Sequence, residues 1–333
     1  MTQPRLLVVL LNFRTAQMCM RAADAAVTAM EGLDAEMVIV DNDSGDGSFE
    51  ELSAFCDGRG WPHVRVVASG HNGGFGAGNN FGIRAGRMDG QRPDYVYILN
   101  SDAFPAPDAI RTLLDWCDAH PQTGIAGSYI HGVEGDAHDT AFRFPSIASE
   151  FEHAIRLGPV SRLLAHKRVP MALPTTPERV DWLAGASMMM RMDMLDRIGL
   201  FDETFFLYFE ETDLCLRAAR DGWDTIYHPD SRVAHVGSVS TGMKGWQRIP
   251  QYWLDSRLHY FTKNHGAFYA TLATAAHVTG GVLWRLRRVI QRKPPADPPQ
   301  FLGDLFAHAL RAPFRAAPKS PSRHPQDPAK RLS

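Results

Sequence analysis

The chain has little cysteine and no apolar run that is clearly long enough to cross a bilayer. Four of the 333 residues are cysteines, and none forms a Cys-x-x-Cys pair with another. This argues against a zinc or disulfide framework and for a reducing compartment. Near the N-terminus only residues 6–11 form an unbroken apolar stretch. Six residues are too few for the core of a signal peptide and fit a buried strand better.

Two nucleotide-binding signatures are also missing. Residues 70–86 are rich in Gly and Asn, but they match neither G-x-G-x-x-G after the first strand nor G-x-x-x-x-G-K-[S/T]. NAD binding and P-loop chemistry therefore lose support. Glycines still allow a backbone to approach a ligand closely, and this loop leads to a helix N-terminus suited to phosphate.

The net charge of −2 hides an uneven distribution. Residues 285–333 contain eleven Lys or Arg and three Asp or Glu, a balance of +8, so residues 1–284 carry −10. A basic region on an acidic body suggests contact with an anionic partner, either a membrane surface or a nucleic acid. The alternative is a solvated, disordered tail. Nucleic-acid binding would rest on this charge alone and is not expected.

Segments typical of strands alternate with helix-like segments through the first half. We expect strands at residues 6–11, 35–40, 64–68 and 95–99, and helices at 16–30, 49–56 and 107–120. This alternation predicts an α/β fold with a mostly parallel central sheet flanked by helices. In such sheets ligands bind beyond the carboxyl ends of the strands, where Asn12, residues 41–42 and residues 100–102 lie.

The second half is less regular. Residues 131–179 are expected to form a mobile or substrate-specific segment, and residues 231–235 a strand. Residues 252–284 have a helical pattern. We predict a catalytic domain over residues 1–265, a helical extension over 266–312 and a disordered basic tail over 313–333.

The helical extension is a candidate membrane contact. Residues 268–284 are apolar but only 17 long, at the lower limit for crossing a bilayer, so they could span or lie on the membrane. Residues 301–310 carry apolar pairs at 301/302, 305/306 and 309/310, which form a stripe on one helix face. Basic residues beside an amphipathic helix suit an interfacial anchor. The alternative is that these helices pack on the body.

Three neighbouring acids are the strongest candidates for chemistry. Glu210, Glu211 and Asp213 follow a run of aromatic residues. Carboxylates beside so much apolar surface are costly to bury unless they bind a cation, share a proton or do chemistry. The alternative is a helix start, because acids in a first turn interact favourably with the helix dipole.

Three further polar residues end predicted strands. Asp102 could hold a divalent cation against a diphosphate, since Mg²⁺ and Mn²⁺ commonly share their ligands between carboxylates and phosphates. Asp41 could accept a hydrogen bond from the N3–H of uracil or thymine. For both, the alternative is a turn that caps the next helix. His235 ends the strand at 231–235, and a lone His is more often structural than a ligand.

Seven short motifs occur in one order along the chain. They are Asn12 after the first strand, 40–42 with 44 and 46–48, 72–76 with 79–80, 99–102, 182–186, 201–217, and His235 with Ser240. Together they resemble the family-2 glycosyltransferases of the GT-A fold, especially the bacterial rhamnosyltransferase-like branch. The resemblance covers roughly residues 5–265.

The resemblance implies an inverting, metal-dependent sugar transferase. Glu211 would be the catalytic base, with Glu210 and Asp213 as alternatives, and Asp102 and His235 would bind Mg²⁺ or Mn²⁺. The donor would be a nucleoside-diphosphate sugar, with dTDP or UDP as the nucleotide. The acceptor would be a glycan or a lipid-linked glycan in cell-surface polysaccharide assembly. The protein would be cytoplasmic, peripheral at the inner face of the cell membrane.

The same resemblance assigns the donor site. Asp41 would contact the nucleotide base, and Gly185 and Ala186 would line the sugar pocket. The other expected donor-binding residues are Asn12, Asn72, Gly73, Gly74, Asn79, Asn80, Asn100, Ser101 and Trp182.

The chain departs from the family pattern at three positions. Glu211 stands where Asp is usual, Leu11 where many relatives have an aromatic residue that stacks on the base, and Asn100 at the first Asp of the DxD motif. The first departure leaves the base open among Glu211, Glu210 and Asp213. Two other interpretations also stay open: a nucleotidyltransferase that makes a sugar nucleotide, and a non-catalytic, membrane-attached glycan or nucleotide binder.

Overall fold

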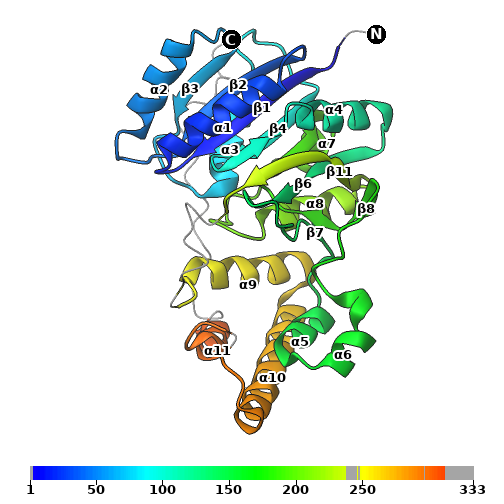
Figure 1. Ribbon diagram of the computed structural model, residues 1–333. Coiled ribbons are helices and arrows are strands. Elements are labelled where there is room, and N and C mark those ends of the chain that lie inside the picture. The colour runs from blue at the N-terminus through cyan, green and yellow to red at the C-terminus, as the bar shows by residue number, and fades with distance from the viewer. Residues whose placement is uncertain (1–2, 238–245, 247, 296, 312–333) are drawn as a thin grey trace, which may run out of the picture.

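The computed structural model describes residues 3–237, 246, 248–295 and 297–311 (Figure 1). Its upper part is built on a nine-stranded sheet. The strands are β1 (Arg5–Asn12), β2 (Asp34–Asp41), β3 (Val64–Ala68), β4 (Tyr95–Asn100), β5 (Ala103–Pro105), β6 (Thr123–His131), β8 (Glu178–Val180), β10 (Ser187–Arg191) and β11 (Asp224–His235). A separate pair is formed by β7 (Ala141–Phe142) and β9 (Trp182–Leu183).

The order of strands across the large sheet is β3-β2-β1-β4-β10-β6-β11-β5, with β8 beside β11. Six of the nine strands run in the same direction, and β5, β8 and β10 run against them. The predicted mostly parallel sheet is therefore confirmed. The register pairs Asn12 with Asp41 and Leu11 with Asn100, so the polar ends of three strands meet at one edge.

Helices cover both faces of the sheet, as the alternating pattern predicts. On one face lie α1 (Ala16–Ala29), α2 (Ser48–Arg59) and α4 (Ala109–Ala119). On the other face lie α3 (Phe75–Ala85), α7 (Met192–Ile198) and α8 (Glu210–Arg220). The strands read as continuous apolar runs because both of their faces are buried.

The helix α3 needs glycine to approach the sheet. A Cβ atom on Gly82 would lie 2.5 Å from Val9 Cγ1 and 2.9 Å from Val40 Cγ2, and one on Gly78 would lie 2.5 Å from Leu11 Cδ1. Such distances are far inside van der Waals contact. Part of the glycine in residues 70–86 therefore serves helix–sheet packing rather than ligand binding.

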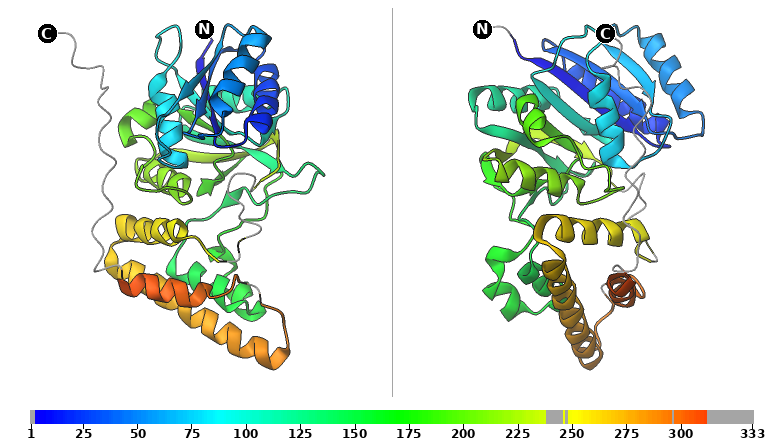
Figure 2. Two further views of the ribbon diagram at one scale, coloured as in Figure 1. Left: turned by 90° about the vertical axis from the view of Figure 1, so that its left-hand side faces the viewer. Right: turned by 180° about the vertical axis from the view of Figure 1, so that it is seen from behind.

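A second, helical lobe lies below the sheet (Figures 1 and 2). It consists of α5 (Ile147–Ile155), α6 (Gly158–Leu163), the 3₁₀ turn η1 (Ala165–Lys167), α9 (Gln251–His265), α10 (Ala267–Gln291) and α11 (Phe301–Arg311). The prediction that residues 131–179 are irregular is wrong for α5 and α6. Both are short, and α5 owes its start to a local capping box between Ser146 and Ser149.

A buried ion cluster ties three helices of this lobe together. Glu150 on α5 accepts hydrogen bonds of 2.7 Å from Arg257 on α9 and from His277 on α10. Burial opposes the charge on Glu150, but Arg257 and His277 outweigh it and lower the pKa of that carboxyl to about 2. The lobe is thus a connected body and not a set of loose helices.

The amphipathic stripe predicted at residues 301–310 is directed inward in part. Phe301, Leu302 and Leu305 are buried, and Leu302 sits where a Cβ on Gly281 would collide with it at 2.8 Å. Three of the six stripe residues thus pack on the body, whereas Phe306 and Leu310 are exposed. None of the helices in the described part of the chain is long and apolar enough to cross a membrane. Ser240 and the predicted tail at 313–333 lie outside the described residues.

Candidate active site

A cavity of about 650 Å³ opens at the sheet edge where β1, β2 and β4 end. The segment before α8 and the first turn of α9 complete its wall. Eleven of the seventeen predicted site residues line it: Asn72, Gly74, Asn100, Ser101, Asp102, Trp182, Gly185, Ala186, Glu210, Glu211 and His235. The structure thus gathers residues that are up to 163 positions apart in the sequence.

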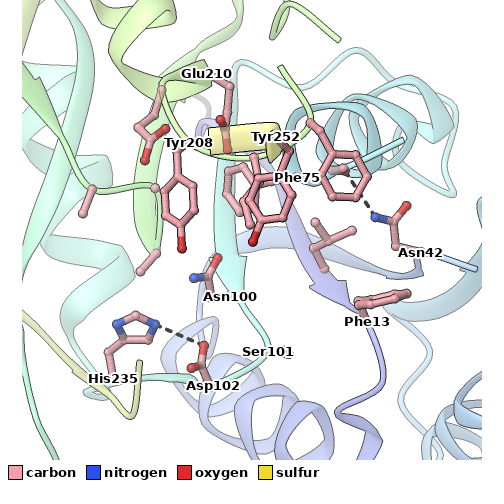
Figure 3. Close-up of a pocket in the computed structure, with 18 of the residues that line it drawn as sticks. Phe13, Asn42, Phe75, Asn100, Ser101, Asp102, Tyr208, Glu210, His235 and Tyr252 are labelled. Carbon is pink, nitrogen blue, oxygen red and sulfur yellow. Dashed lines mark hydrogen bonds and ion pairs between the residues drawn. The ribbon is translucent and has the colours of Figure 1, made fainter. Parts of the chain in front are cut away.

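One end of the cavity holds Asp102 and His235. The Asp102 Oδ1 atom lies 3.1 Å from His235 Nε2, and Asp102 Oδ2 accepts a hydrogen bond of 3.0 Å from the Gly237 N–H (Figure 3). These contacts arise because β5, directly after Asp102, pairs with the end of β11. Burial works against the charge on Asp102, but the hydrogen bond with His235 lowers the pKa of this carboxyl below its usual range.

This end fits a divalent cation that shares its shell with a phosphate ligand. Asp102 offers a carboxylate and His235 an imidazole, and Asn100 and Ser101 line the cavity beside them. The described residues contain no cluster of three or more His, Cys, Asp or Glu side chains. The protein would therefore supply part of the shell, as is common for Mg²⁺ sites that bind phosphates.

The opposite end holds Glu210 and Glu211, the first two residues of α8. Figure 3 shows Glu210 across the cavity from Asp102 and His235. Glu210 is only 2% exposed, whereas Glu211 is partly exposed. The Oε2 atoms of both side chains are buried and have no hydrogen-bond partner among the described residues.

The lack of partners changes the acidity of this pair. Burial, followed by the charge of Glu211, raises the pKa of Glu210 well above its usual range. Burial also raises the pKa of Glu211 to about 7, although backbone hydrogen bonds from Glu211 and Gly185 act against it. At neutral pH the pair therefore holds a proton and can exchange one.

The backbone before the pair has an unusual conformation. Tyr208 and Phe209 are both in the left-handed region, with φ of 69° and 70°. Such backbone costs a non-glycine residue of the order of 1–2 kcal/mol and persists only when its surroundings hold it. Phe209 is held by Trp253 and Tyr260, with ring centroids at 5.9 and 5.5 Å.

The glycine-rich loop holds the same segment from the other side. The Phe75 N–H donates a hydrogen bond of 2.9 Å to the Phe206 carbonyl oxygen. Gly74, with φ of 95°, allows this contact, because a Cβ there would lie 1.8 Å from that oxygen. The N-terminus of α3 thus positions the segment before Glu210.

Comparison with known proteins decides what kind of site this is. The sequence model of the family described as "Glycosyltransferase like family 2" matches residues 4–252.

The chain belongs to this glycosyltransferase family.

Its relatives include two rhamnosyltransferases. It is 30% identical over 219 residues to N-acetylglucosaminyl-diphospho-decaprenol L-rhamnosyltransferase of Mycobacterium tuberculosis, over 62% of this chain and 68% of that protein. It is 28% identical over 165 residues to the rhamnosyltransferase WbbL of Escherichia coli, over 49% of this chain and 60% of that protein. The predicted likeness to the rhamnosyltransferase branch is confirmed.

Solved structures confirm the predicted GT-A fold. The mannosyltransferase PcManGT from Pyrobaculum calidifontis, in complex with GDP-Man and Mn²⁺, superposes with a TM-score of 0.53 at 15% identity, over 94% of this chain and 88% of that one. The structure of GalNAc-T7 with UDP, GalNAc and Mn²⁺ gives a TM-score of 0.55 at 15% identity, over 96% of this chain and 59% of that one.

The glycosyltransferase cavity has an aromatic wall, of which the sequence predicted only Trp182. Trp182 stacks on Phe142 with ring centroids 4.1 Å apart, and Tyr208 stacks on Tyr252 at 6.4 Å. Tyr252 belongs to α9, so the helical lobe contributes to the site (Figure 3). Only the aromatic density of residues 205–209 and 252–253 could have drawn attention to it. The lining residues outside the predicted set are Leu11, Phe13, Asn42, Phe75, Phe142, Ala184, Phe206, Leu207, Tyr208 and Tyr252.

Asn12 and Asp41 lie behind the cavity rather than on its wall. The Asp41 Oδ1 atom accepts hydrogen bonds from Asn12 Nδ2 at 2.9 Å and from Ser44 Oγ at 2.6 Å. The neighbouring Asn42 does line the cavity and donates to Asn72 Oδ1 at 3.1 Å. This polar network supports the edge at which Phe13 and Asn42 lie.

Asn79 and Asn80 on α3 also lie outside the cavity wall, as does Gly73 in the loop before it. Asn80 donates to the Phe201 carbonyl and accepts from the Phe201 N–H, at 2.8 and 3.1 Å. Asn79 donates to the Phe75 carbonyl at 3.0 Å. Asn80 thus holds α3 and the segment at 201–209 together, whereas the bond of Asn79 lies within α3.

Asp213 is the predicted base candidate that the structure keeps away from the cavity. It is fully buried, and its carboxylate accepts hydrogen bonds from Arg217, Lys263 and Asn264 at 2.8 to 2.9 Å. These three donors occupy its oxygen atoms, and Asp213 does not line the cavity. The candidates for a base in this cavity are therefore Glu210 and Glu211.

Proposed function

We propose that this glycosyltransferase moves a sugar from a nucleoside-diphosphate sugar to a hydroxyl group of a lipid-linked glycan, with inversion and with help from a divalent metal. The observation that carries the proposal is the pair of unlike carboxylate sites at opposite ends of one cavity (Figure 3). One end is suited to a departing diphosphate and the other to an incoming hydroxyl.

Asp102 and His235 would hold Mg²⁺ or Mn²⁺ at the diphosphate end. When bound, the ion offsets the negative charge that builds on the leaving diphosphate. Asp102 suits this role because its lowered pKa keeps it ionised at neutral pH. Both solved neighbours described above are complexes with Mn²⁺, which supports a metal at the donor site of this fold.

Glu211 is the proposed base. Its carboxylate accepts the proton of the acceptor hydroxyl while the hydroxyl oxygen bonds to the anomeric carbon and the bond from that carbon to the diphosphate oxygen breaks. Attack from the face opposite the leaving group inverts the anomeric configuration. Glu211 is favoured over Glu210 because it is partly exposed and its pKa is about 7, close to the optimum for proton transfer at neutral pH.

Rhamnose from dTDP-rhamnose is the donor we propose first. The names of the two rhamnosyltransferase relatives support the sugar, and the acceptor in one name is a glycan on a diphospho-decaprenol. Gly185 and Ala186 would line the sugar pocket and Asn42, beside Asp41, would face the nucleotide. We propose that the reaction takes place at the cytoplasmic membrane face, where a lipid-linked acceptor is held.

A panel of nucleotide sugars tests this proposal. The chain is incubated with dTDP-rhamnose and with UDP- and GDP-sugars, with Mn²⁺ or Mg²⁺, and with a lipid-linked N-acetylglucosamine acceptor. Release of nucleoside diphosphate together with a lengthened acceptor is expected, and the Glu211→Gln variant is the matched control. Release of pyrophosphate from a nucleoside triphosphate and a sugar phosphate would instead indicate a nucleotidyltransferase. Binding of nucleotide sugars without any turnover would indicate a non-catalytic binder.

A further inference from the structure

No other residue of the described part of the chain covers the outer face of α10, which is apolar toward both ends of the helix. We define this α10 outer face by Phe268, Leu272, Val282, Leu286, Val289 and Ile290, all of which are exposed. Phe268 is 79% exposed, Val289 70% and Ile290 82%. Residues on the opposite side, such as Ala273, His277 and Gly280, are buried against the rest of the lobe.

The spacing shows that these residues form one stripe. Phe268 and Leu272 are four residues apart, as are Val282 and Leu286 and then Leu286 and Ile290. Phe268 and Leu286 are 18 residues apart, which is five turns, so these side chains project from the same side of the helix. A helix of 25 residues is about 37 Å long. The face that a surface helix normally fills with polar residues is here filled with apolar ones, and exposed apolar patches of this kind mark interaction sites.

Charge on the same helix selects the partner. The helix has no Asp or Glu, and the exposed Arg292 and Lys293 follow its end. Arg285 and Arg288 in its last turns are partly exposed, whereas Arg287 bonds inward to the Ile155 and Arg156 carbonyls. Apolar side chains with Lys and Arg at their flank are the pattern of helices that lie in the headgroup region of anionic bilayers. A second copy of this chain would match the apolar stripe but not this excess of positive charge.

From these observations we infer that the α10 outer face docks on an anionic lipid bilayer, with the helix lying along the surface. This inference deepens the proposed function, because it names the surface that would bring the enzyme to a lipid-linked acceptor. Figures 1 and 2 show α10 running from the end of α9 to the part of the lobe farthest from the sheet, where it can reach a surface without hindrance from the catalytic body. Of the two predicted candidate contacts, residues 268–284 and 301–310, it favours the first, as a helix that lies on the membrane.

Vesicle co-sedimentation of the full chain without substrates tests the inference. We expect binding to vesicles of phosphatidylcholine mixed with phosphatidylglycerol, and weaker binding to phosphatidylcholine alone. Leu286→Ser with Ile290→Ser should reduce the partition coefficient about tenfold or more per site, since each side chain leaves an apolar contact. Both side chains are exposed, so the fold should be unaffected.

Arg292→Gln with Lys293→Gln should reduce binding to the anionic vesicles by roughly fivefold per charge and should leave binding to phosphatidylcholine unchanged.

Two controls make the result decisive. Val133→Ser with Leu163→Ser removes equally exposed apolar side chains elsewhere and should bind like the wild type. Glu211→Gln should also bind like the wild type, so failure of the catalytic proposal would not affect this measurement. A wild-type chain that stays in the supernatant with every vesicle overturns the inference. So does a wild-type dimer that Leu286→Ser with Ile290→Ser converts to a monomer, because the face would then be covered by a second copy.

Discussion

The two ends of the active-site cavity contain carboxylates that are buried alike and yet differ in acidity. Asp102 is 5% exposed and has His235 and the Gly237 N–H as partners, and its pKa is lowered. Glu210 is 2% exposed, has an unpartnered Oε2 atom, and its pKa is raised. Burial therefore does not decide the protonation state here, whereas the presence of a donor does. A displacement reaction needs both outcomes, one end that stays ionised and one that takes a proton.

The largest effect is expected from removing the proton acceptor. Glu211→Gln keeps the size of the side chain but cannot accept the proton, so kcat should fall by about 10²- to 10⁴-fold. Donor affinity, measured as the Kd of the nucleotide sugar with Mn²⁺, should stay within about twofold, because the diphosphate end is intact.

The neighbouring residue provides the matched control. The raised pKa of Glu210 already favours its neutral form, so Glu210→Gln changes little and should reduce kcat much less. If Glu210→Gln is the inactive variant and Glu211→Gln keeps full transfer, the roles of the two residues are the reverse of those proposed.

The second largest effect is expected at the other end. Asp102→Asn removes the charge that would hold the metal, so kcat/KM should fall by at least about 100-fold, more than loss of an outer partner of a metal site usually costs. The concentration of Mn²⁺ needed for half-maximal activity should rise, and chelation of metal should abolish wild-type activity. Asp115→Asn, a change at an exposed Asp on α4, is the control. An Asp102→Asn enzyme with an unchanged Mn²⁺ requirement would exclude Asp102 as a ligand.

The pH dependence should separate the two ends. Glu211 must be ionised to act as a base, so log kcat/KM should rise with pH and level off above about 7, falling about tenfold per pH unit below that. Asp102 stays ionised through this range because its pKa is lowered.

The free energy of unfolding should fall as the pH rises, which is the opposite of the trend in kcat/KM. The folded-state pKa of Glu211 is raised from 4.5 to about 7, so the folded state binds this proton more tightly than the unfolded state does. The contribution to the free energy of unfolding is thus present at low pH and is lost as pH rises through about 7. In Glu211→Gln both the activity inflection and this loss should be absent, which chemical denaturation at several pH values checks.

The sequence predicted the first half of the fold well for a physical reason. Parallel strands buried on both faces, such as residues 6–11 and 95–99, appear as unbroken apolar runs between turn residues. The strand β6 (Thr123–His131) was not predicted, because two glycines and an alanine interrupt its apolar pattern. The helix α5 was missed because it is nine residues long, and a helix so short depends on tertiary contacts such as those with α9 and α10.

The site was predictable where chemistry leaves a sequence signature and not where tertiary structure decides. Asp102, His235, Glu210 and Glu211 were all named from motifs and all line the cavity. The sequence could not tell that Asn80 would bond to Phe201 rather than face a ligand, since both roles suit an amide. Nor could it predict that Tyr252 reaches the cavity, because that depends on how α9 crosses below the sheet.

The smallest effect on catalysis is expected at Asp213. Like Asp102, this carboxylate has hydrogen-bond partners, but it lies outside the cavity. Asp213→Asn keeps the side-chain shape and can still accept one hydrogen bond, but it leaves Arg217 and Lys263 without their counter-charge. Both cations are partly exposed and can turn to solvent, so the free energy of unfolding should fall by only about 1–3 kcal/mol.

The kcat of the folded Asp213→Asn enzyme should stay within about threefold of the wild type, because Asp213 does not touch the cavity. Thermal denaturation and kcat measured on the same preparation separate these two quantities. A fall in kcat comparable to that of Glu211→Gln, with an unchanged melting temperature, would mean that a partnered carboxylate can serve as the base, and the contrast between the two ends would lose its explanation.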